Sequence, residues 1–226
     1  MGALTKILLA ATLCAGQAGA IDLAALGDGG RFRVPLTSIK EARFKTTLRQ
    51  QYDFSCGSAA VATLLSHHYA YPVTEQFVFE QMFAHGDQQK IRKEGFSLLD
   101  IKRFLETQGF KADGFHLPLQ KLGEAGFPAI VLLSENGYNH FVVVKGLQPG
   151  RVLIGDPASG TRAIARASFE AMWRSKLLFV IHDHQGVVRF NEAVDWRVAP
   201  PAPLSAAIQR GGLDQLTMPK NGPGDF

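Results

Sequence analysis

Cys56 is the residue whose type and setting most clearly suggest chemistry. From Cys56 to about Tyr69, apolar side chains recur at helical spacing, so the cysteine stands in the first turn of a predicted helix. The positive end of the helix dipole favours the thiolate, which is the nucleophilic form of cysteine. A cysteine can equally be a small apolar residue at the start of a buried helix. Other residues must therefore decide between the two readings.

His140 and Asp156 are the two further residues that could act with a thiol. His140 opens an apolar segment that continues through Val144, and Asp156 follows the apolar segment 152–155 and precedes a proline. Both segments are typical of strands, and the Gln148-Pro149-Gly150 sequence between them is typical of a tight turn.

The turn fixes a predicted register between these two strands. With residues 148–150 as the loop, Leu147 pairs with Arg151 and Val142 faces Asp156. His140 then lies on the same face as Asp156, as a diagonal neighbour roughly 7–8 Å away between backbones, a gap that the two side chains can close.

Together these groups suit cysteine acyl transfer. The imidazole of His140 can take the thiol proton, and the Asp156 carboxylate can orient the imidazole. Gln50, six residues before Cys56, could place its side-chain amide beside the Cys56 backbone N–H and so complete an oxyanion site. Gln51 competes for this role, and the sequence leaves the choice open.

The elements that must position these residues divide the chain into two halves. The helices predicted in the first half are 56–69, 74–83, capped by Thr74, and 98–108, opened by a Ser97–Asp100 capping box and closed by Gly109. The strands predicted in the second half are 110–117, 129–133, 141–147, 152–155 and 177–181, with short helices at 119–125 and 168–176. This order predicts an α+β fold, in which an N-terminal helical layer packs on an antiparallel sheet.

Composition narrows the class of protein. The 226 residues are 46% hydrophobic and carry a net charge of +4 with no run of Lys or Arg, which predicts one globular domain and no nucleic-acid partner. We expect no metal or other cofactor. His67, His68, His182 and His184 form clusters that lack enough further ligands for a metal site, and the chain has no phosphate-binding or dinucleotide motif.

The N-terminus has the pattern of a secretory signal peptide. Lys6 precedes the apolar run 7–15, and Ala18-Gly19-Ala20 suits a cleavage site. We predict a signal peptide at 1–20, an irregular N-terminal arm at 21–47 with an edge strand near 31–36, a catalytic domain at 48–184 and a C-terminal extension at 185–226. We therefore expect a periplasmic or secreted protein with no membrane span, whose mature form retains a single thiol after Cys14 is removed.

The motifs resemble those of a known family. Gln50-Gln51-Tyr52-Asp53-Phe54-Ser55-Cys56-Gly57-Ser58-Ala59-Ala60, Asn139-His140-Phe141-Val142-Val143 and Gly155-Asp156-Pro157 resemble the bacteriocin-processing, or double-glycine, cysteine peptidases. The resemblance implies a papain-like fold over the domain at 48–184. It also implies that Cys56 is the nucleophile, His140 the base, Asp156 the orienting residue and Gln50 the oxyanion donor. Ser55 departs from the aspartate that many members carry directly before the nucleophile.

The context favours a free-standing exported branch of that family. Many members are domains of peptide-exporting ABC transporters, whereas this sequence combines the signal peptide with no transporter motifs. It is similar to the periplasmic peptidase of functional-amyloid secretion systems. The resemblance implies cleavage of an exported polypeptide after a Gly-Gly-type site, with secretion-system components as further partners. The alternative is a non-catalytic papain-like binding module that assists export or assembly of a secreted protein.

Overall fold

The computed structural model describes residues 20–24, 31–35, 37–135 and 137–200. The predicted signal peptide, apart from Ala20, and residues 201–226 of the predicted C-terminal extension lie outside these ranges. The chain divides into two compact units, residues 1–42 and 43–226. We describe each unit by itself.

The first unit contains a β-hairpin. Strand β1 (Ala20–Ala24) pairs antiparallel with β2 (Arg31–Pro35). The predicted edge strand near 31–36 is confirmed as β2. The prediction of an irregular arm is wrong for β1, whose Ile21 and Leu23 alternate with small or polar residues as strand residues do. The short helix α1 (Ile39–Arg43) crosses the boundary between the two units.

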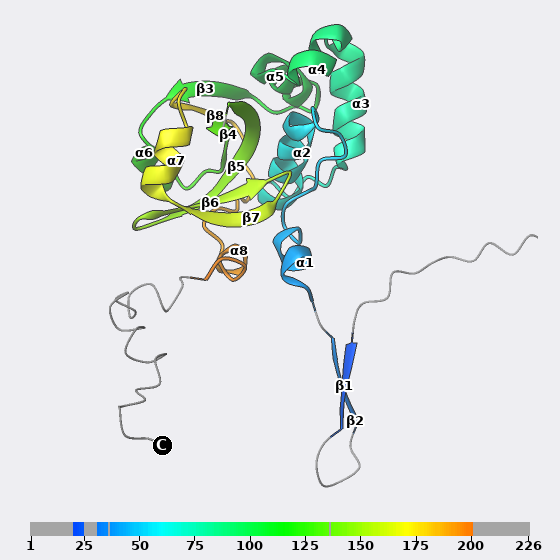
Figure 1. Ribbon diagram of the computed structural model, residues 1–226. Coiled ribbons are helices and arrows are strands. Elements are labelled where there is room, and N and C mark those ends of the chain that lie inside the picture. The colour runs from blue at the N-terminus through cyan, green and yellow to red at the C-terminus, as the bar shows by residue number, and fades with distance from the viewer. Residues whose placement is uncertain (1–19, 25–30, 36, 136, 201–226) are drawn as a thin grey trace, which may run out of the picture. The chain divides into compact units, whose positions relative to one another are not determined.

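A layer of helices opens the second unit (Figure 1). It contains α2 (Cys56–Thr63), the π-helical turn η1 (Leu64–His68), α3 (Glu75–His85), α4 (Gln88–Glu94) and α5 (Leu98–Thr107). The predicted helix 56–69 is therefore present, but its last turn is a π-helix. The Thr74 cap and the Ser97–Asp100 capping box are confirmed. Helix α4 was not predicted, because Ile91 is its one buried residue and seven residues show no apolar period.

The second half of this unit is a six-stranded antiparallel sheet in the order β3-β8-β4-β5-β6-β7. Its strands are β3 (Ala112–His116), β4 (Ala129–Glu135), β5 (Tyr138–Gln148), β6 (Arg151–Asp156), β7 (Gly160–Ala165) and β8 (Leu177–Ile181). Helices α6 (Leu119–Ala125), α7 (Arg166–Met172) and α8 (Ala193–Trp196) complete the unit. The predicted α+β class is confirmed, and β7 is the sheet strand that the sequence did not reveal.

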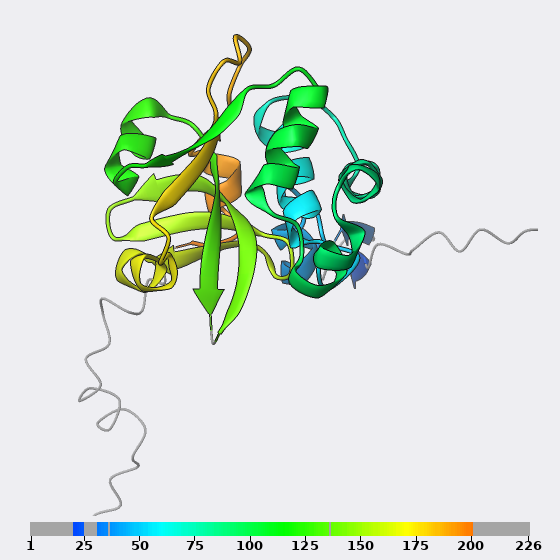
Figure 2. The same cartoon turned by 90° about the horizontal axis from the view of Figure 1, so that it is seen from above.

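The sheet is buried on both faces. Phe141 and Val143 of β5 belong to a core shared with the helical layer, whereas Val142 and Val144 belong to a second core with α6 and α7. This alternation follows from the two-residue period of a strand. Figure 2 shows the helical layer on one side of the sheet and α6 and α7 on the other.

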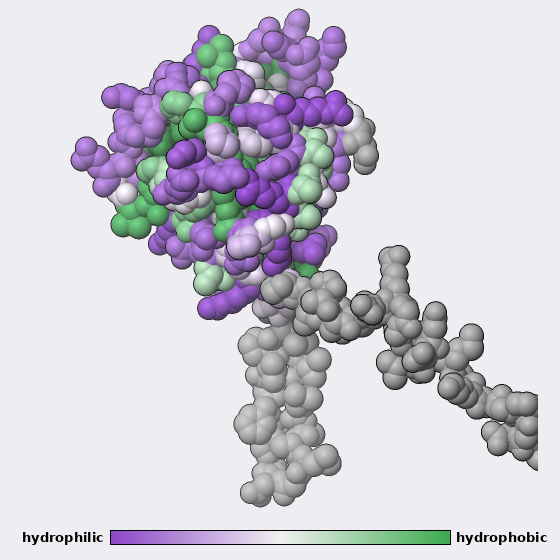
Figure 3. Space-filling view, turned by 90° about the vertical axis from the view of Figure 1, so that its left-hand side faces the viewer, coloured by the Kyte–Doolittle hydropathy of each residue, from purple (hydrophilic) through white to green (hydrophobic). Residues whose placement is uncertain are grey.

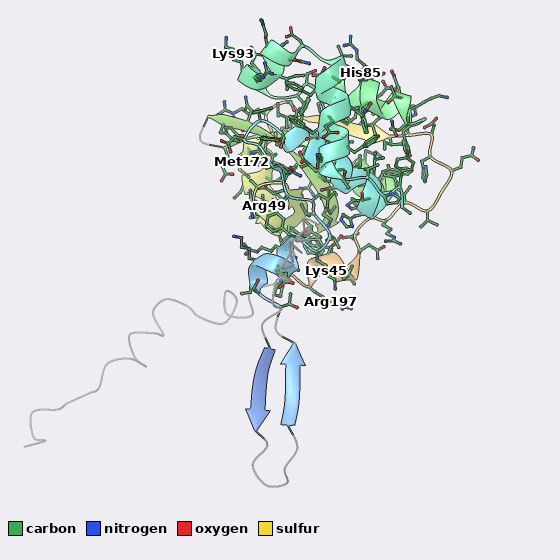
Figure 4. The ribbon with its side chains drawn as sticks, turned by 90° about the vertical axis from the view of Figure 1, so that its right-hand side faces the viewer. Lys45, Arg49, His85, Lys93, Met172 and Arg197 are labelled. Carbon is green, nitrogen blue, oxygen red and sulfur yellow. The ribbon has the colours of Figure 1, made fainter. Side chains whose placement is uncertain are left out.

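The face of the second unit that carries α6 and α7 is mostly polar (Figure 3). Hydrophilic side chains dominate there, with hydrophobic ones scattered among them. On the helical side, His85 at the end of α3 and Lys93 on α4 lie at the surface (Figure 4). In the described part of the chain, no helix is long and apolar enough to cross a membrane.

The β5–β6 register differs from the prediction at the turn and agrees with it near the site. Gln148 pairs with Arg151, so the loop has two residues, Pro149 and Gly150, and not the predicted three. A β-bulge between Val144 and Gly146 then shifts the register by one residue. Beyond the bulge, Val143 pairs with Gly155, which is the register that the three-residue loop would have given.

Candidate active site

Cys56 is the first residue of α2, and Ser55 is the N-cap residue. The Ser55 hydroxyl makes no cap bond and instead donates to the carbonyl of Tyr52 at 3.0 Å. The N–H groups of Cys56 and Gly57 approach the Cys56 sulfur instead, as does the backbone N–H of Phe141 on β5. The sulfur thus lies among three backbone donors that could stabilise a thiolate.

Gly57 allows the start of α2 to pack closely against Phe96. A Cβ at this position would lie 3.0 Å from the Cβ of Phe96 and 3.5 Å from the ring of Phe141. The first distance is shorter than ordinary packing allows. The glycine that follows the cysteine therefore allows the close approach of the helix start to Phe96, whereas the distance to Phe141 on β5 is an ordinary packing distance.

Burial opposes the thiolate form that the helix N-terminus favours. Cys56 is 6% exposed, and this burial is the largest influence and raises the pKa of the thiol. The surrounding N–H groups lower the pKa, and the charge of Asp156 raises it, but burial dominates. A reactive thiolate therefore depends on a proton acceptor beside the sulfur.

His140 is the third residue of β5 and is 7% exposed. Its Nε2 lies 3.5 Å from Oδ2 of Asp156, longer than a hydrogen bond, and neither ring nitrogen has a hydrogen-bond partner among the described residues. The Tyr138 ring stacks on the imidazole with centroids 5.9 Å apart. The Tyr138 hydroxyl donates to the carbonyl of Asp53 at 2.9 Å, which links β5 to the loop before Cys56.

Asp156 ends β6 and organises the turn to β7. Its Oδ1 accepts from the backbone N–H groups of Ala158 at 2.9 Å and Ser159 at 3.3 Å. Burial raises the pKa of the carboxyl, but the interaction with His140 and the Ala158 N–H outweigh it and hold the pKa well below its usual range. Asp156 is therefore ionised at neutral pH and available to orient the imidazole.

The structure brings Gln50 to this site and leaves Gln51 outside. The Gln50 backbone N–H donates to the carbonyl of Pro157 at 3.1 Å, which fastens it beside Asp156. Its side-chain amide donates to the Tyr52 carbonyl at 3.0 Å. Gln50 also lines a cavity of about 370 Å³ with His140 and Asp156. Gln51 is exposed and is not among the lining residues.

Three residues of this cavity with aromatic or charged side chains were given no role by the sequence. Tyr138, Glu135 and Arg162 all line it. Tyr138 stands two residues before His140, which was a usable signal. Glu135 and Arg162 gave none, because the contact between them depends on β7, which was not predicted.

The remaining histidines have other surroundings. His182 pairs with Asp113 through Nε2 at 2.9 Å, and His184 packs edge-on against Tyr69. His68 is buried in the core. Within the described ranges, no cluster of three or more His, Cys, Asp or Glu could hold a metal ion.

Comparison with known proteins agrees with this geometry. Residues 45–185 match the model of the peptidase C39 family. The chain is 40% identical over 200 residues to the probable functional amyloid protease FapD of Pseudomonas aeruginosa, covering 88% of this chain and 84% of that protein.

Two solved structures are also similar. A double-glycine-motif protease from an AMS/PCAT transporter, crystallised in complex with its leader peptide, is 25% identical, with a TM-score of 0.50 over 59% of this chain and 88% of that one. The peptidase domain of Streptococcus ComA is 20% identical, with a TM-score of 0.52 over 62% and 98%, and supports the papain-like fold. The thiol, imidazole and carboxylate described above thus lie in a cysteine peptidase, and the chain belongs to the peptidase C39, or double-glycine bacteriocin-processing, family.

Proposed function

We propose that this protein is an exported cysteine endopeptidase that cleaves an exported polypeptide after a Gly-Gly-type site, with Cys56, His140 and Asp156 as its catalytic triad. One observation carries the proposal. Strand β5 presents two consecutive residues to the two halves of the site, His140 to the Asp156 carboxylate and the Phe141 N–H to the Cys56 sulfur. His140 is thus the titratable base on the strand segment that reaches the sulfur, and we assign it as the proton acceptor that the buried thiol needs.

The reaction follows from these positions. His140 takes the proton from the Cys56 thiol, and the sulfur attacks the carbonyl carbon of the scissile bond. As the tetrahedral intermediate collapses, the C–N bond breaks, and His140 passes the proton to the leaving amine. Water, deprotonated by His140, then attacks the thioester, which releases the carboxylate product and restores the thiol. Asp156 holds the imidazole ring throughout.

Gln50 is the proposed oxyanion donor, together with the backbone N–H of Cys56. The Gln50 side-chain amide donates to the Tyr52 carbonyl at 3.0 Å, and its second contact, with the Asp53 carbonyl, is 3.4 Å long. The longer contact is the weaker one and can give way to a developing oxyanion. Removing such a donor from related chemistry lowers kcat by about 10²–10³-fold.

The substrate class is proposed from the relatives and the N-terminal sequence. The FapD relative is described as a functional amyloid protease, and the solved double-glycine protease holds a leader peptide. Both descriptions favour a polypeptide substrate, and the signal-peptide pattern at 1–20 favours a reaction outside the cytoplasm. A narrow groove beside the nucleophile would admit glycine and exclude larger side chains by steric overlap.

A peptide series tests this function. Peptides that vary the two residues before the scissile bond are incubated with the protein, and products are identified by mass spectrometry. We expect cleavage after Gly-Gly or Gly-Ala, loss of cleavage with Cys56→Ala, and retained binding in that variant. Equal cleavage after Gly-Gly and Leu-Lys would reject the specificity. Peptide binding without cleavage by the unmodified protein would favour the non-catalytic binding module.

A further inference from the structure

Asp156 is contacted by more than His140. Its Oδ2, the oxygen 3.5 Å from His140 Nε2, also accepts from Arg162 Nε at 3.2 Å and from Arg162 Nη2 at 3.0 Å. The arginine contacts are the shorter ones and are charge-assisted. The carboxylate that orients the imidazole is therefore shared with a permanent cation.

Glu135, which also lines the cavity, contacts the same arginine. Its Oε2 lies 3.6 Å from Arg162 Nη2, and the side chain of Glu135 is half exposed. Glu135 ends β4, whereas Arg162 lies on β7 opposite Ile154 of β6. Charges of alternating sign thus continue outward from the imidazole, through Asp156 and Arg162 to Glu135.

We propose that Arg162 is a positioning residue that holds the Asp156 carboxylate and limits how strongly this carboxylate favours the protonated form of His140. Glu135 in turn weakens the effect of the Arg162 charge. The inference rests on the proposed function, because it assigns these two residues a role through the triad. Neither contacts the sulfur, so neither is a catalytic residue.

Removing either charge should shift the pH at which the thiol and imidazole lose a proton, and the two shifts have opposite directions. Removing the Arg162 charge leaves Asp156 uncompensated, so the thiol and imidazole pair holds its protons to higher pH. Removing the Glu135 charge leaves more positive charge beside the imidazole, so the pair loses a proton at lower pH. The other titratable or charged groups beside the thiol and imidazole, which both variants leave unchanged, are Tyr138 on β5 and Asp156 on β6, and Asp53 in the preceding loop acts on Tyr138.

The test is the pH dependence of Cys56 alkylation by iodoacetamide, which does not require a substrate. Labelling is followed by mass spectrometry on the peptide that contains Cys56, so that Cys14 does not interfere. The labelling rate rises with pH in the acidic range, and a His140→Ala variant identifies the part of that rise that depends on the imidazole.

We expect the midpoint of that rise to move up by about one pH unit in Arg162→Gln and down by about half a unit in Glu135→Gln, the order expected for a unit charge at an intermediate dielectric constant. Arg162→Lys keeps the charge but loses the paired N–H donors of the guanidinium group, and its midpoint should stay within about 0.3 pH units of that of the unmodified protein.

Equal midpoints in the unmodified protein, Arg162→Gln and Glu135→Gln would overturn the inference, as would equal shifts in Arg162→Gln and Arg162→Lys, which would indicate a purely structural role. If Arg162→Gln does not fold, as judged by circular dichroism, Glu135→Gln alone decides by the direction of its shift. Absence of any His140-dependent rise in the unmodified protein would instead overturn the proposed function, and the inference with it.

Discussion

The buried imidazole of His68 should make stability fall as the solution becomes mildly acidic. His68 lies on the π-helical turn η1 and is 1% exposed. Its Nδ1 lies 2.6 Å from the carbonyl oxygen of Arg189, so Nδ1 is the donor. Its Nε2 has no hydrogen-bond partner among the described residues. A second proton on this ring would therefore be buried without an acceptor.

The surroundings of His68 set the direction and size of the effect. The pKa of His68 is lowered to about 4; burial is the largest cause and the charge of Lys145 acts in the same direction, while the Arg189 carbonyl and Asp195 oppose them. Below an unfolded pKa of about 6.5, the unfolded chain binds a proton that the folded chain does not. The free energy of unfolding therefore falls between about pH 6.5 and 4, by about 3 kcal/mol in total, and His68 contributes no pH dependence above that window.

Urea unfolding at several pH values between 7.5 and 4.5 measures this effect. Asn at position 68 can still donate to the Arg189 carbonyl but cannot titrate, so His68→Asn should lose most of the slope below pH 6.5. A smaller slope should remain, because burial also lowers the pKa of His67. The exposed His85 offers a matched control, and His85→Asn should keep the full slope. If His68→Asn and the unmodified protein lose stability in parallel, the reasoning is refuted.

Three further perturbations follow from the packing and the charges. Lys145→Met should lower the free energy of unfolding by about 3–5 kcal/mol in urea titrations. The Lys145 ammonium lies 3.0 Å from Asp195, so the variant leaves that carboxylate buried without its ionic partner. An unchanged midpoint of urea unfolding would contradict this. Gly57→Ala should destabilise by about 1–3 kcal/mol through overlap with Phe96, although alanine favours helix, so a stabilised variant would refute the close contact. Asp156 has a lowered pKa and so contributes stability above its unfolded pKa of about 3.9, which is lost as the pH falls below that value. Asp156→Asn should therefore flatten the acid end of the stability profile, and an unchanged acid limb would argue against this.

The sequence predicted best those features that depend on residues close together in the chain, such as helix caps and the pairing of two strands joined by a turn. The cap residues Thr74 and Ser97 marked true helix starts because a capping bond is local in the chain. The pairing of His140 with Asp156 was also predicted, although through the wrong turn. The two-residue turn and the bulge at Lys145 shift the register in opposite directions, so the error cancels before the site is reached.

Long-range contacts account for what the sequence did not reveal. Lys145 stands within a strand of valines, and its full burial depends on Asp195, fifty residues later, and on Thr46. Strand β7 has few β-branched residues and follows a turn, so its pattern did not stand out. Arg162 therefore could not be placed beside Asp156, because a residue on an unpredicted strand has no predicted neighbours.

We propose that Cys56 is a nucleophile activated by His140 in a site that admits a glycine pair. A peptide that ends in Gly-Gly and carries a chloromethyl ketone in place of the scissile bond tests it most directly, with the intact mass and the modified residue read by mass spectrometry. We expect one equivalent of peptide on Cys56, at least tenfold slower labelling in His140→Ala, and little labelling by the same peptide ending in Leu-Lys. Equal labelling rates in the unmodified protein and His140→Ala, or modification of a residue other than Cys56, would contradict it.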